Sequence, residues 1–449
     1  MKFISIVLVA GLFLGCTVEK NHEPKKNNVL NLKKEAQIED VVVEDLINIP
    51  QDIAYYTKAI ETKKLYDVQK KYEESYFSVW NIAKPTQSLE NTQWAFKYFH
   101  ASKSYGENLV PLKQDFFDAM YKKSNFGKYA TVNKKALTLQ YSSMRAFPTS
   151  KPLLLDPSIA GEGFPFDYLQ NSSVHANVPL LISHYSEDGQ WVFVFNSFTF
   201  GWLKTSEVVL ISDIHASTWK NATQILITKE GIPLYNEKGA ALFDTRIGMM
   251  FALIEEDKTD YTILTISSYK DNQAMFNKSK IPKDAGSKKI LTLNSMNLNK
   301  IVKEVSKTNY GWGGVYGQRD CSSTLMDLFA PFGIWLPRNS SQQSKVGKVF
   351  NLKNFDDTQK IQFIKEKAIP FQTLLYKKGH IVLYAGIHNG EIIVYQNVWG
   401  IHTIKDGEKG RFIIGKPVFS TLRLGNELKN YDKDSELLGN IESMNTLTR

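Results

Sequence analysis

The stretch that decides the fold class reads Tyr310-Gly311-Trp312-Gly313-Gly314-Val315-Tyr316-Gly317-Gln318-Arg319-Asp320-Cys321-Ser322-Ser323. Four glycines lie within residues 311–317, and they let the backbone approach a ligand closely. Apolar residues recur at helical spacing after Cys321, so we predict a helix that begins there with Asp320 as its cap. A thiol at a helix N-terminus faces the positive end of the helix dipole, which favours the thiolate. The free N–H groups of that turn can also stabilise an oxyanion. A buried structural cysteine is the alternative.

A thiolate nucleophile needs a base, and His380 best meets this need. It opens a predicted strand in the same C-terminal region as Cys321, whereas His388 lies beside a turn where we expect it to be exposed. That turn, Asn389-Gly390, is a strong hairpin signal, and folding back around it pairs Leu383 with Gln396. Gln396 and Asn397 then lie near His380, where one of the two amides can orient the imidazole through Nδ1. We choose Gln396 and keep Asn397 as the alternative.

The rest of the chain divides by its hydrophobic period. Residues 46–137 show helical spacing, and residues 138–213 alternate with a period of two in short strands, as in a small barrel. Residues 214–285 weakly repeat that order, so we predict a second barrel. Residues 286–429 place helices before closing strands, which makes an α+β domain, and residues 430–449 read as a frayed polar tail.

The N-terminus has the pattern of a targeting segment. Residues 1–15 carry one positive charge, an apolar stretch and then small Gly15, as in a signal peptide. Leu12-Phe13-Leu14-Gly15-Cys16 resembles a bacterial lipobox, although Phe13 stands where Leu is usual, so we expect Cys16 to be lipidated. Residues 16–45 are polar, as in a flexible tether. An ordinary signal peptide with an incidental cysteine is the alternative.

Composition excludes several classes of protein. The chain has 449 residues, 43% of them hydrophobic, with 26 Phe and 21 Tyr, which excludes a disordered protein. The net charge of +9 is scattered, which argues against nucleic-acid binding. There are two cysteines, Cys16 and Cys321. If the first becomes an acyl anchor, the second remains an unpaired thiol. Scattered histidines offer no zinc site, so we expect no metal and no cofactor.

These motifs resemble the NlpC/p60 family of bacterial cell-wall cysteine peptidases. Tyr310-Gly311-Trp312-Gly313-Gly314, Asp320-Cys321-Ser322 and Gly379-His380 with its hairpin carry the resemblance. The family's third catalytic residue is most often His and sometimes Asn or Gln. The resemblance implies a papain-like catalytic domain preceded by two bacterial SH3-like domains and a helical stabilising segment.

The resemblance also implies a function. Relatives with this architecture cleave the γ-D-glutamyl–diaminopimelate bond of peptidoglycan stem peptides, and Tyr310, Asp320 and Ser322 would line the subsite for the L-Ala-γ-D-Glu portion. In some relatives the first SH3-like domain demands a free L-Ala amine, for which Asp167 and Tyr168 have suitable chemistry. We expect a monomer in the periplasm, anchored by lipid at Cys16, with Thr17 pointing to the outer membrane. A non-catalytic peptidoglycan-binding or scaffold lipoprotein is the alternative, and a preference for intact sacculi or free muropeptides stays open.

Overall fold

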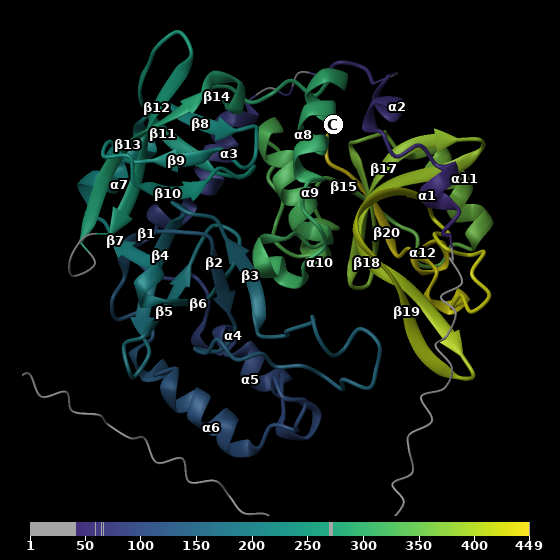
Figure 1. Ribbon diagram of the computed structural model, residues 1–449, viewed down its shortest axis with the longest axis horizontal. Helices are drawn as coiled ribbons and strands as arrows, with labels where there is room; N and C mark the ends of the chain where they lie inside the picture. The colour runs from purple at the N-terminus through teal and green to yellow at the C-terminus, as the bar shows by residue number, and fades with distance from the viewer. Residues whose placement is uncertain (1–41, 59, 64, 66, 269–272, 449) are drawn as a thin grey trace, which may run out of the picture. The chain divides into compact units, whose positions relative to one another are not determined.

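The computed structural model describes residues 42–448 apart from 59, 64, 66 and 269–272 (Figure 1). The predicted signal peptide, the predicted lipidation at Cys16 and the predicted tether up to residue 41 lie outside the described residues. Within the described part of the chain, no helix has the length and apolar character that crossing a bilayer requires.

Short helices fill the N-terminal part, as its helical spacing predicts. They are α1 (Asp45–Asn48), α2 (Ile53–Thr57), α3 (Val68–Tyr76), α4 (Leu89–Thr92), α5 (Trp94–Tyr98) and α6 (Gln114–Lys123), with 3₁₀ turns η1 (Ser78–Trp80), η2 (Ala101–Lys103) and η3 (Phe126–Lys128). Their buried aromatic side chains share hydrophobic cores with the sheets that follow. Phe96, for example, stacks on Phe147 with ring centroids 4.0 Å apart. These helices therefore support the barrels.

The first sheet has seven strands in the order β3-β2-β6-β5-β4-β1-β7. They are β1 (Lys134–Thr138), β2 (Ser142–Arg145), β3 (Gln170–Val174), β4 (Pro179–Tyr185), β5 (Trp191–Phe195), β6 (Phe200–Lys204) and β7 (Val208–Leu210), with η4 (Thr205–Glu207) before the last. All the strand pairs of this sheet are antiparallel. The sheet begins four residues before the predicted boundary of 138, because Lys134–Leu137 pair with β4.

The second barrel follows α7 (Asp213–Asn221). Five strands take the order β13-β12-β11-β8-β14, and β9 and β10 form a separate ribbon. The strands are β8 (Gln224–Ile227), β9 (Pro233–Tyr235), β10 (Ala241–Asp244), β11 (Met250–Glu256), β12 (Asp260–Ser268), β13 (Ala274–Pro282) and β14 (Gly286–Ser287), with η6 (Lys283–Ala285) before the last. Phe251, Ile263 and Ile281 are fully buried in the core that both barrels share.

The C-terminal part joins helices to a six-stranded sheet of order β15-β20-β16-β17-β18-β19. The strands are β15 (Lys348–Asn351), β16 (Thr373–Lys377), β17 (His380–His388), β18 (Glu391–Lys405), β19 (Glu408–Thr421) and β20 (Ser443–Thr446). The helices are α8 (Ser295–Val305), α9 (Cys321–Phe329), α10 (Ser340–Gln343), α11 (Asp357–Lys367) and α12 (Leu437–Asn440), and η7 (Trp312–Gly317), η8 (Ala330–Phe332) and η9 (Lys433–Ser435) are 3₁₀ turns. The predicted helix from Cys321 is confirmed, as is the α+β class.

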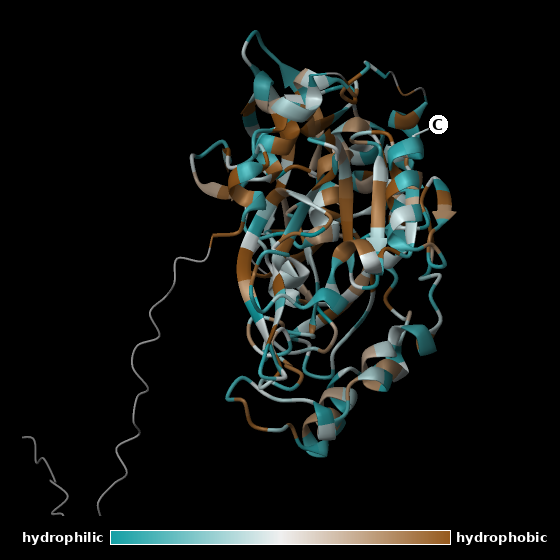
Figure 2. Ribbon diagram, turned by 90° about the vertical axis from the view of Figure 1, so that its right-hand side faces the viewer, coloured by the Kyte–Doolittle hydropathy of each residue, from teal (hydrophilic) through white to brown (hydrophobic). Residues whose placement is uncertain are grey.

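Two separate cores hold this sheet. Leu383 and Tyr395 face α8 and α9, and Val382 and Val394 face α11 on the opposite side. Figure 1 shows α8 and α9 on one side of β17 and β18 and α11 on the other. The strands are brown with apolar residues where these layers meet, and the helix surfaces that face outward are teal (Figure 2). The sheet is therefore buried on both faces, which gives its central strands nearly continuous apolar runs.

The predicted polar tail at 430–449 is wrong. Its residues 443–446 form β20, which pairs with both β15 and β16 inside the sheet, and Met444 is fully buried. The segment is too short and too polar to show a strand pattern, so long-range pairing decides its structure. The end of the predicted tether is corrected as well, because Val43 is buried against Ile401 and Leu428.

Candidate active site

The nucleophile candidate lies where the sequence predicts. Asp320 caps α9, since its carboxylate accepts from the Ser323 N–H at 2.8 Å and the Ser323 hydroxyl accepts from the Asp320 N–H at 2.9 Å. Cys321 is therefore the first residue of the helix, and its N–H group has no acceptor inside the helix. The thiol is buried and accepts a backbone hydrogen bond from Ile381, the residue after His380. This contact brings the nucleophile and the predicted base to the same point of β17.

Burial changes the predicted protonation of the pair. It raises the pKa of the Cys321 thiol to about 12, and the neighbouring Asp320 charge acts in the same direction. It also lowers the pKa of His380 to about 4. The sequence favours a thiolate through the helix dipole, but loss of solvation outweighs that dipole here. At neutral pH the thiol and the imidazole are thus both neutral.

Hydrogen bonds fix the tautomer of His380. Its Nε2 lies 2.8 Å from Gln396 Oε1, and the Gln396 amide N–H donates to Ser420 Oγ at 2.7 Å. Ser420 in turn donates to the carbonyl of Thr421, so its oxygen can only accept from Gln396. Gln396 therefore presents its oxygen to His380, and Nε2 of the imidazole carries the proton. The sequence predicted contact through Nδ1; the contact is through Nε2, which leaves Nδ1 as the basic nitrogen.

A β-bulge selects Gln396 over Asn397. The pairs next to the turn keep the predicted register, with Ile387 opposite Ile392, but beyond the bulge Leu383 lies opposite Tyr395 rather than Gln396. Because side chains alternate along a strand, this shift places Gln396 on the same face as His380. Asn397 faces α9 instead, where it donates to the Arg319 carbonyl at 2.8 Å and to Thr324 Oγ1 at 3.0 Å.

The predicted binding residues Asp320 and Ser322 meet at a buried arginine that the sequence analysis missed. Arg338 follows Pro337, and its guanidinium donates to both carboxylate oxygens of Asp320, at 2.7 and 3.2 Å. It also donates to Ser322 Oγ at 3.1 Å and to Ser172 Oγ of β3 at 2.8 Å. This pairing holds the pKa of Asp320 below its ordinary value and offsets the negative charge beside Cys321. Arg338 has no sequence signal, because its partners come from two segments that are distant from it along the chain, β3 and the start of α9.

The glycine-rich loop is clamped by the two barrels. The Tyr141 hydroxyl donates to the Gly314 carbonyl at 2.5 Å, and Arg246 donates to the carbonyl of Gly317 at 2.5 Å. A Cβ at Gly313, whose φ is +58°, would come within 2.5 Å of the Gln170 carbonyl oxygen. The glycines therefore allow the backbone of the first barrel to approach the loop closely. The sequence pattern predicts only the close approach of a ligand.

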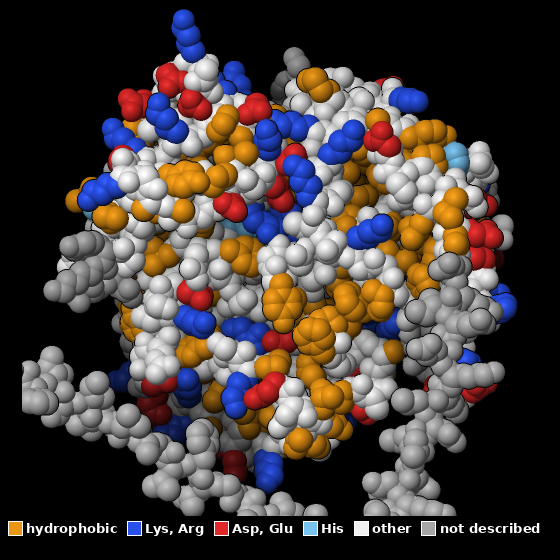
Figure 3. Space-filling view, viewed as in Figure 1, with side chains coloured by type: hydrophobic (Ala, Val, Ile, Leu, Met, Phe, Trp, Pro, Cys, Tyr) orange, Lys and Arg blue, Asp and Glu red, His pale blue; other side chains and the backbone are white. Residues whose placement is uncertain are grey.

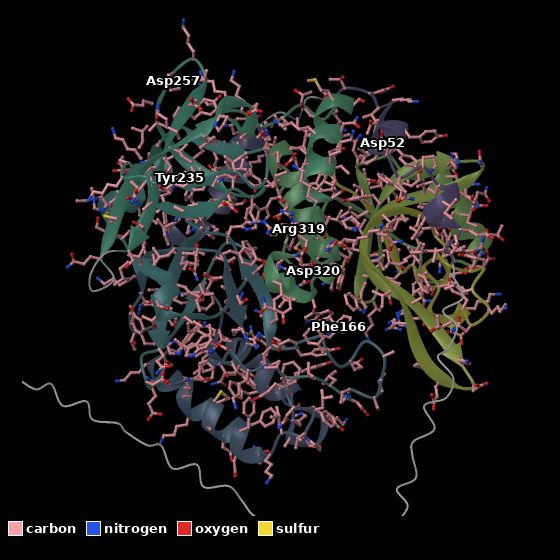
Figure 4. The ribbon with its side chains drawn as sticks, in the orientation of Figure 1. Asp52, Phe166, Tyr235, Asp257, Arg319 and Asp320 are labelled. Atoms are coloured by element: carbon pink, nitrogen blue, oxygen red, sulfur yellow. The ribbon has the colours of Figure 1, made fainter. Side chains whose placement is uncertain are left out.

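A second buried arginine ties the helix of Cys321 to the second barrel. Arg319 donates to Asp327 of α9 at 2.7 Å, and its two Nη atoms donate to the two carboxylate oxygens of Glu230. His175 of the first barrel lies 3.5 Å from the same Asp327. Figure 4 shows Arg319 and Asp320 between the two halves of the chain, with Phe166 below them. The site is thus assembled from several segments.

Aromatic side chains line the mouth of the site. Phe166 contacts Trp312 and Trp399 with ring centroids 5.4 and 5.6 Å apart, and Tyr310 lies 5.9 Å from Trp399. In the same orientation, hydrophobic side chains gather near the centre of the face, with blue lysine and arginine side chains beside them (Figure 3). Of the two residues considered for amine recognition, Asp167 is engaged with Arg145 at 2.5 Å, whereas Tyr168 donates to Glu162 at 2.7 Å.

Two cavities meet at the candidate residues. The larger, of about 1000 Å³, is lined by Cys321, Asp320, Ser322 and Arg338 together with residues of the N-terminal helices and the first barrel. The smaller, of about 270 Å³, is lined by His380 and Gln396. Both share Tyr310, Trp312 and Gly379, so the two cavities adjoin. In the described part of the chain, no group of three His, Cys, Asp or Glu side chains is arranged to hold a metal ion.

Known families match most of the chain. Residues 307–406 match the NlpC/P60 family, residues 152–204 the SH3 domain of SH3b1 type, residues 214–258 the SH3 domain of SH3b2 type, and residues 5–129 the N-terminal NlpC/P60 stabilising domain. A search of curated proteins gave no match.

A solved structure has the same fold as this chain. An NlpC/P60 endopeptidase from Photobacterium damselae subsp. piscicida is 22% identical, with a TM-score of 0.78, over 89% of this chain and 97% of that one. An NlpC/P60 family protein from Bacillus cereus is 17% identical over 62% of this chain and 82% of that one, with a TM-score of 0.44. The chain therefore carries a C-terminal NlpC/P60-family domain behind an N-terminal stabilising domain and two SH3b domains, as the motifs around Cys321 and His380 predicted.

Proposed function

We propose that the protein is a cell-wall cysteine endopeptidase that hydrolyses the γ-D-glutamyl–meso-diaminopimelate bond of peptidoglycan stem peptides. The observation that carries the proposal is Cys321 at the start of α9, held against Ile381, with His380 oriented by Gln396 in an NlpC/P60-family domain. The two SH3b domains and the stabilising domain lie in the same chain as the NlpC/P60 domain, and this combination of domains supports the cell wall as the substrate.

The proposed mechanism starts from a neutral Cys321 thiol and a neutral His380 imidazole. Nδ1 of His380 takes the thiol proton as Cys321 Sγ attacks the γ-glutamyl carbonyl carbon, so charge separates only during the attack. The N–H group of Cys321, free at the helix start, stabilises the oxyanion. His380 then gives that proton to the leaving amine, and a thioester remains. Water, deprotonated by His380, hydrolyses the thioester and restores the thiol.

The substrate's acyl portion has a defined place in this proposal. Asp320, Ser322 and Tyr310 line the larger cavity beside Cys321, on the side where the L-Ala-γ-D-Glu portion would lie. The Asp320 carboxylate forms an ion pair with Arg338, so in this proposal Asp320 positions Ser322 and α9. Tyr310 has a pKa well above its ordinary value because it is buried, so its hydroxyl stays protonated and can donate.

The test uses the tripeptide L-Ala-γ-D-Glu-meso-diaminopimelate, with purified sacculi in parallel, and mass spectrometry of the products. Wild type and a Cys16→Ala control should both release L-Ala-γ-D-Glu, and Cys321→Ala should release none. If the sacculi bind the protein and neither substrate is cleaved, the non-catalytic scaffold becomes the better proposal.

The cellular setting is also a proposal. We propose a monomeric periplasmic lipoprotein that is anchored to the outer membrane through acylated Cys16. The support for the anchor is the sequence of residues 1–16, and Thr17 supports the outer membrane. Mass spectrometry of the N-terminal peptide from membrane fractions should find acyl groups on Cys16, and an unmodified mature N-terminus in the soluble fraction would contradict the anchor.

A further inference from the structure

The smaller cavity has a charge pattern that the proposed chemistry has not yet used. It adjoins His380, and its cations are Lys377, Lys378 and Arg411. Glu436 is paired with Arg423 at 3.4 Å, so Asp432 is the one cavity carboxylate among the described residues that faces Lys377 and Arg411 without a direct ion pair. A half-buried cavity with more cations than free carboxylates attracts an anion.

Arg411 is the best placed of these cations. It lies on β19 with its guanidinium against the loop of the first barrel, where a Cβ at Gly161 would come within 2.8 Å of its Nη2. Among the described residues no carboxylate lies within ion-pair distance of it, and Asp432 and Glu162 act on its charge from farther away. Lys377 Nζ donates to the Ser435 carbonyl at 2.9 Å. Burial lowers the pKa of Lys377, and the nearby charge of Arg411 lowers it further, while Asp432 acts in the opposite direction.

Position identifies which part of a substrate would lie here. The acyl carbon is attacked from Cys321 in the larger cavity, and the leaving amine receives its proton from His380, which lines the smaller one. The atoms beyond the leaving amine must therefore continue into the smaller cavity. On the proposed function, on which this inference rests, those atoms belong to the diamino acid.

We infer that this cavity is the leaving-group subsite and that Arg411 and Lys377 select a leaving amino acid with a carboxylate at the far end of its side chain. Diaminopimelate carries an ammonium and a carboxylate there, whereas lysine carries the ammonium alone. Arg411 offers a planar fork to the carboxylate, and Asp432, which accepts from Ser435 Oγ at 2.6 Å, lies within the same cavity to meet the ammonium.

The experiment compares L-Ala-γ-D-Glu-meso-diaminopimelate with L-Ala-γ-D-Glu-L-Lys. Wild type should show a kcat/KM about tenfold or more higher for the diaminopimelate peptide, the size of one charge-assisted hydrogen bond. Arg411→Gln should remove most of that ratio by lowering kcat/KM for the diaminopimelate peptide alone, and Arg411→Lys should restore part of it. Lys416→Gln, an exposed cation on the same strand, should leave the ratio unchanged.

Equal losses on both peptides in Arg411→Gln, or an unchanged ratio, would overturn the inference and leave the proposed function standing. If wild type cleaves neither peptide, the proposed function fails, and calorimetry on Cys321→Ala decides the inference by itself. Tighter binding of the diaminopimelate peptide that is lost in the Cys321→Ala/Arg411→Gln double variant supports the subsite; equal binding of the two peptides refutes it.

Discussion

Replacing Arg338 by Met should destabilise the protein by about 3–5 kcal/mol, the cost of leaving one member of a buried ion pair without its partner. The Arg338 and Asp320 side chains are 8% and 12% exposed, so solvent cannot replace the lost contact. Met fills similar space, so the main losses are the charge and the hydrogen bonds to Asp320, Ser322 and Ser172. The uncompensated Asp320 charge should also raise the pKa of Cys321 further and slow the reaction.

Urea unfolding followed by tryptophan fluorescence measures this effect. The control is Lys97→Gln, whose pair with Glu90 lies on the surface with side chains 56% and 76% exposed, and it should leave the free energy of unfolding nearly unchanged. Adding Asp320→Asn to Arg338→Met should recover part of the loss, because the unpaired charge is then removed. A loss below about 1 kcal/mol for Arg338→Met, or full additivity of the pair, would refute the reasoning.

Three further predictions concern the base and the C-terminal strand. Gln396→Ala should lower kcat about tenfold or more, because it removes the hydrogen bond that fixes the His380 tautomer. Gln396→Glu should retain that bond and move the acid limb of the pH–activity profile to higher pH, since a carboxylate stabilises the imidazolium. Equal kcat values for Gln396→Ala and wild type would contradict this role. The pKa of His380 is about 4, so kcat/KM should stay level through neutral pH and fall only as pH drops through about 4, where the base becomes protonated; an acid limb between pH 6 and 7 would show a solvated imidazole instead. Met444→Ala should lower the free energy of unfolding by about 2–5 kcal/mol, because Met444 is fully buried in β20. The control Met296→Ala, at a side chain that is 74% exposed, should change it by less than about 0.5 kcal/mol. Similar urea midpoints for the two variants would argue against the strand assignment.

Local patterns in the sequence suffice for much of the site. The helix that starts at Cys321 and its Asp320 cap follow from apolar spacing and a capping residue, and the turn at Asn389-Gly390 follows from its dipeptide. These features depend on residues within a few positions of one another. The order of helical segment, two barrels and α+β domain is also readable, because the hydrophobic period changes along the chain.

Features that depend on distant partners were not readable. The bulge between Tyr384 and Gly386 shifts the register by one residue, and only that shift places Gln396 beside His380. Arg338 collects partners from β3 and α9. Burial of Cys321, which overrides the helix dipole, is itself a product of packing. β20 becomes a strand because β15 and β16 leave room for it between them.

The most direct test of the central claim is the mass of the acyl-enzyme. Wild type mixed with L-Ala-γ-D-Glu-meso-diaminopimelate and quenched in acid within milliseconds to seconds should carry an L-Ala-γ-D-Glu adduct on the peptide that contains Cys321, and free diaminopimelate should be released with it. The adduct should be absent from Cys321→Ala. Product formation with no adduct on Cys321, or an undiminished rate in Cys321→Ala, would contradict a thioester mechanism.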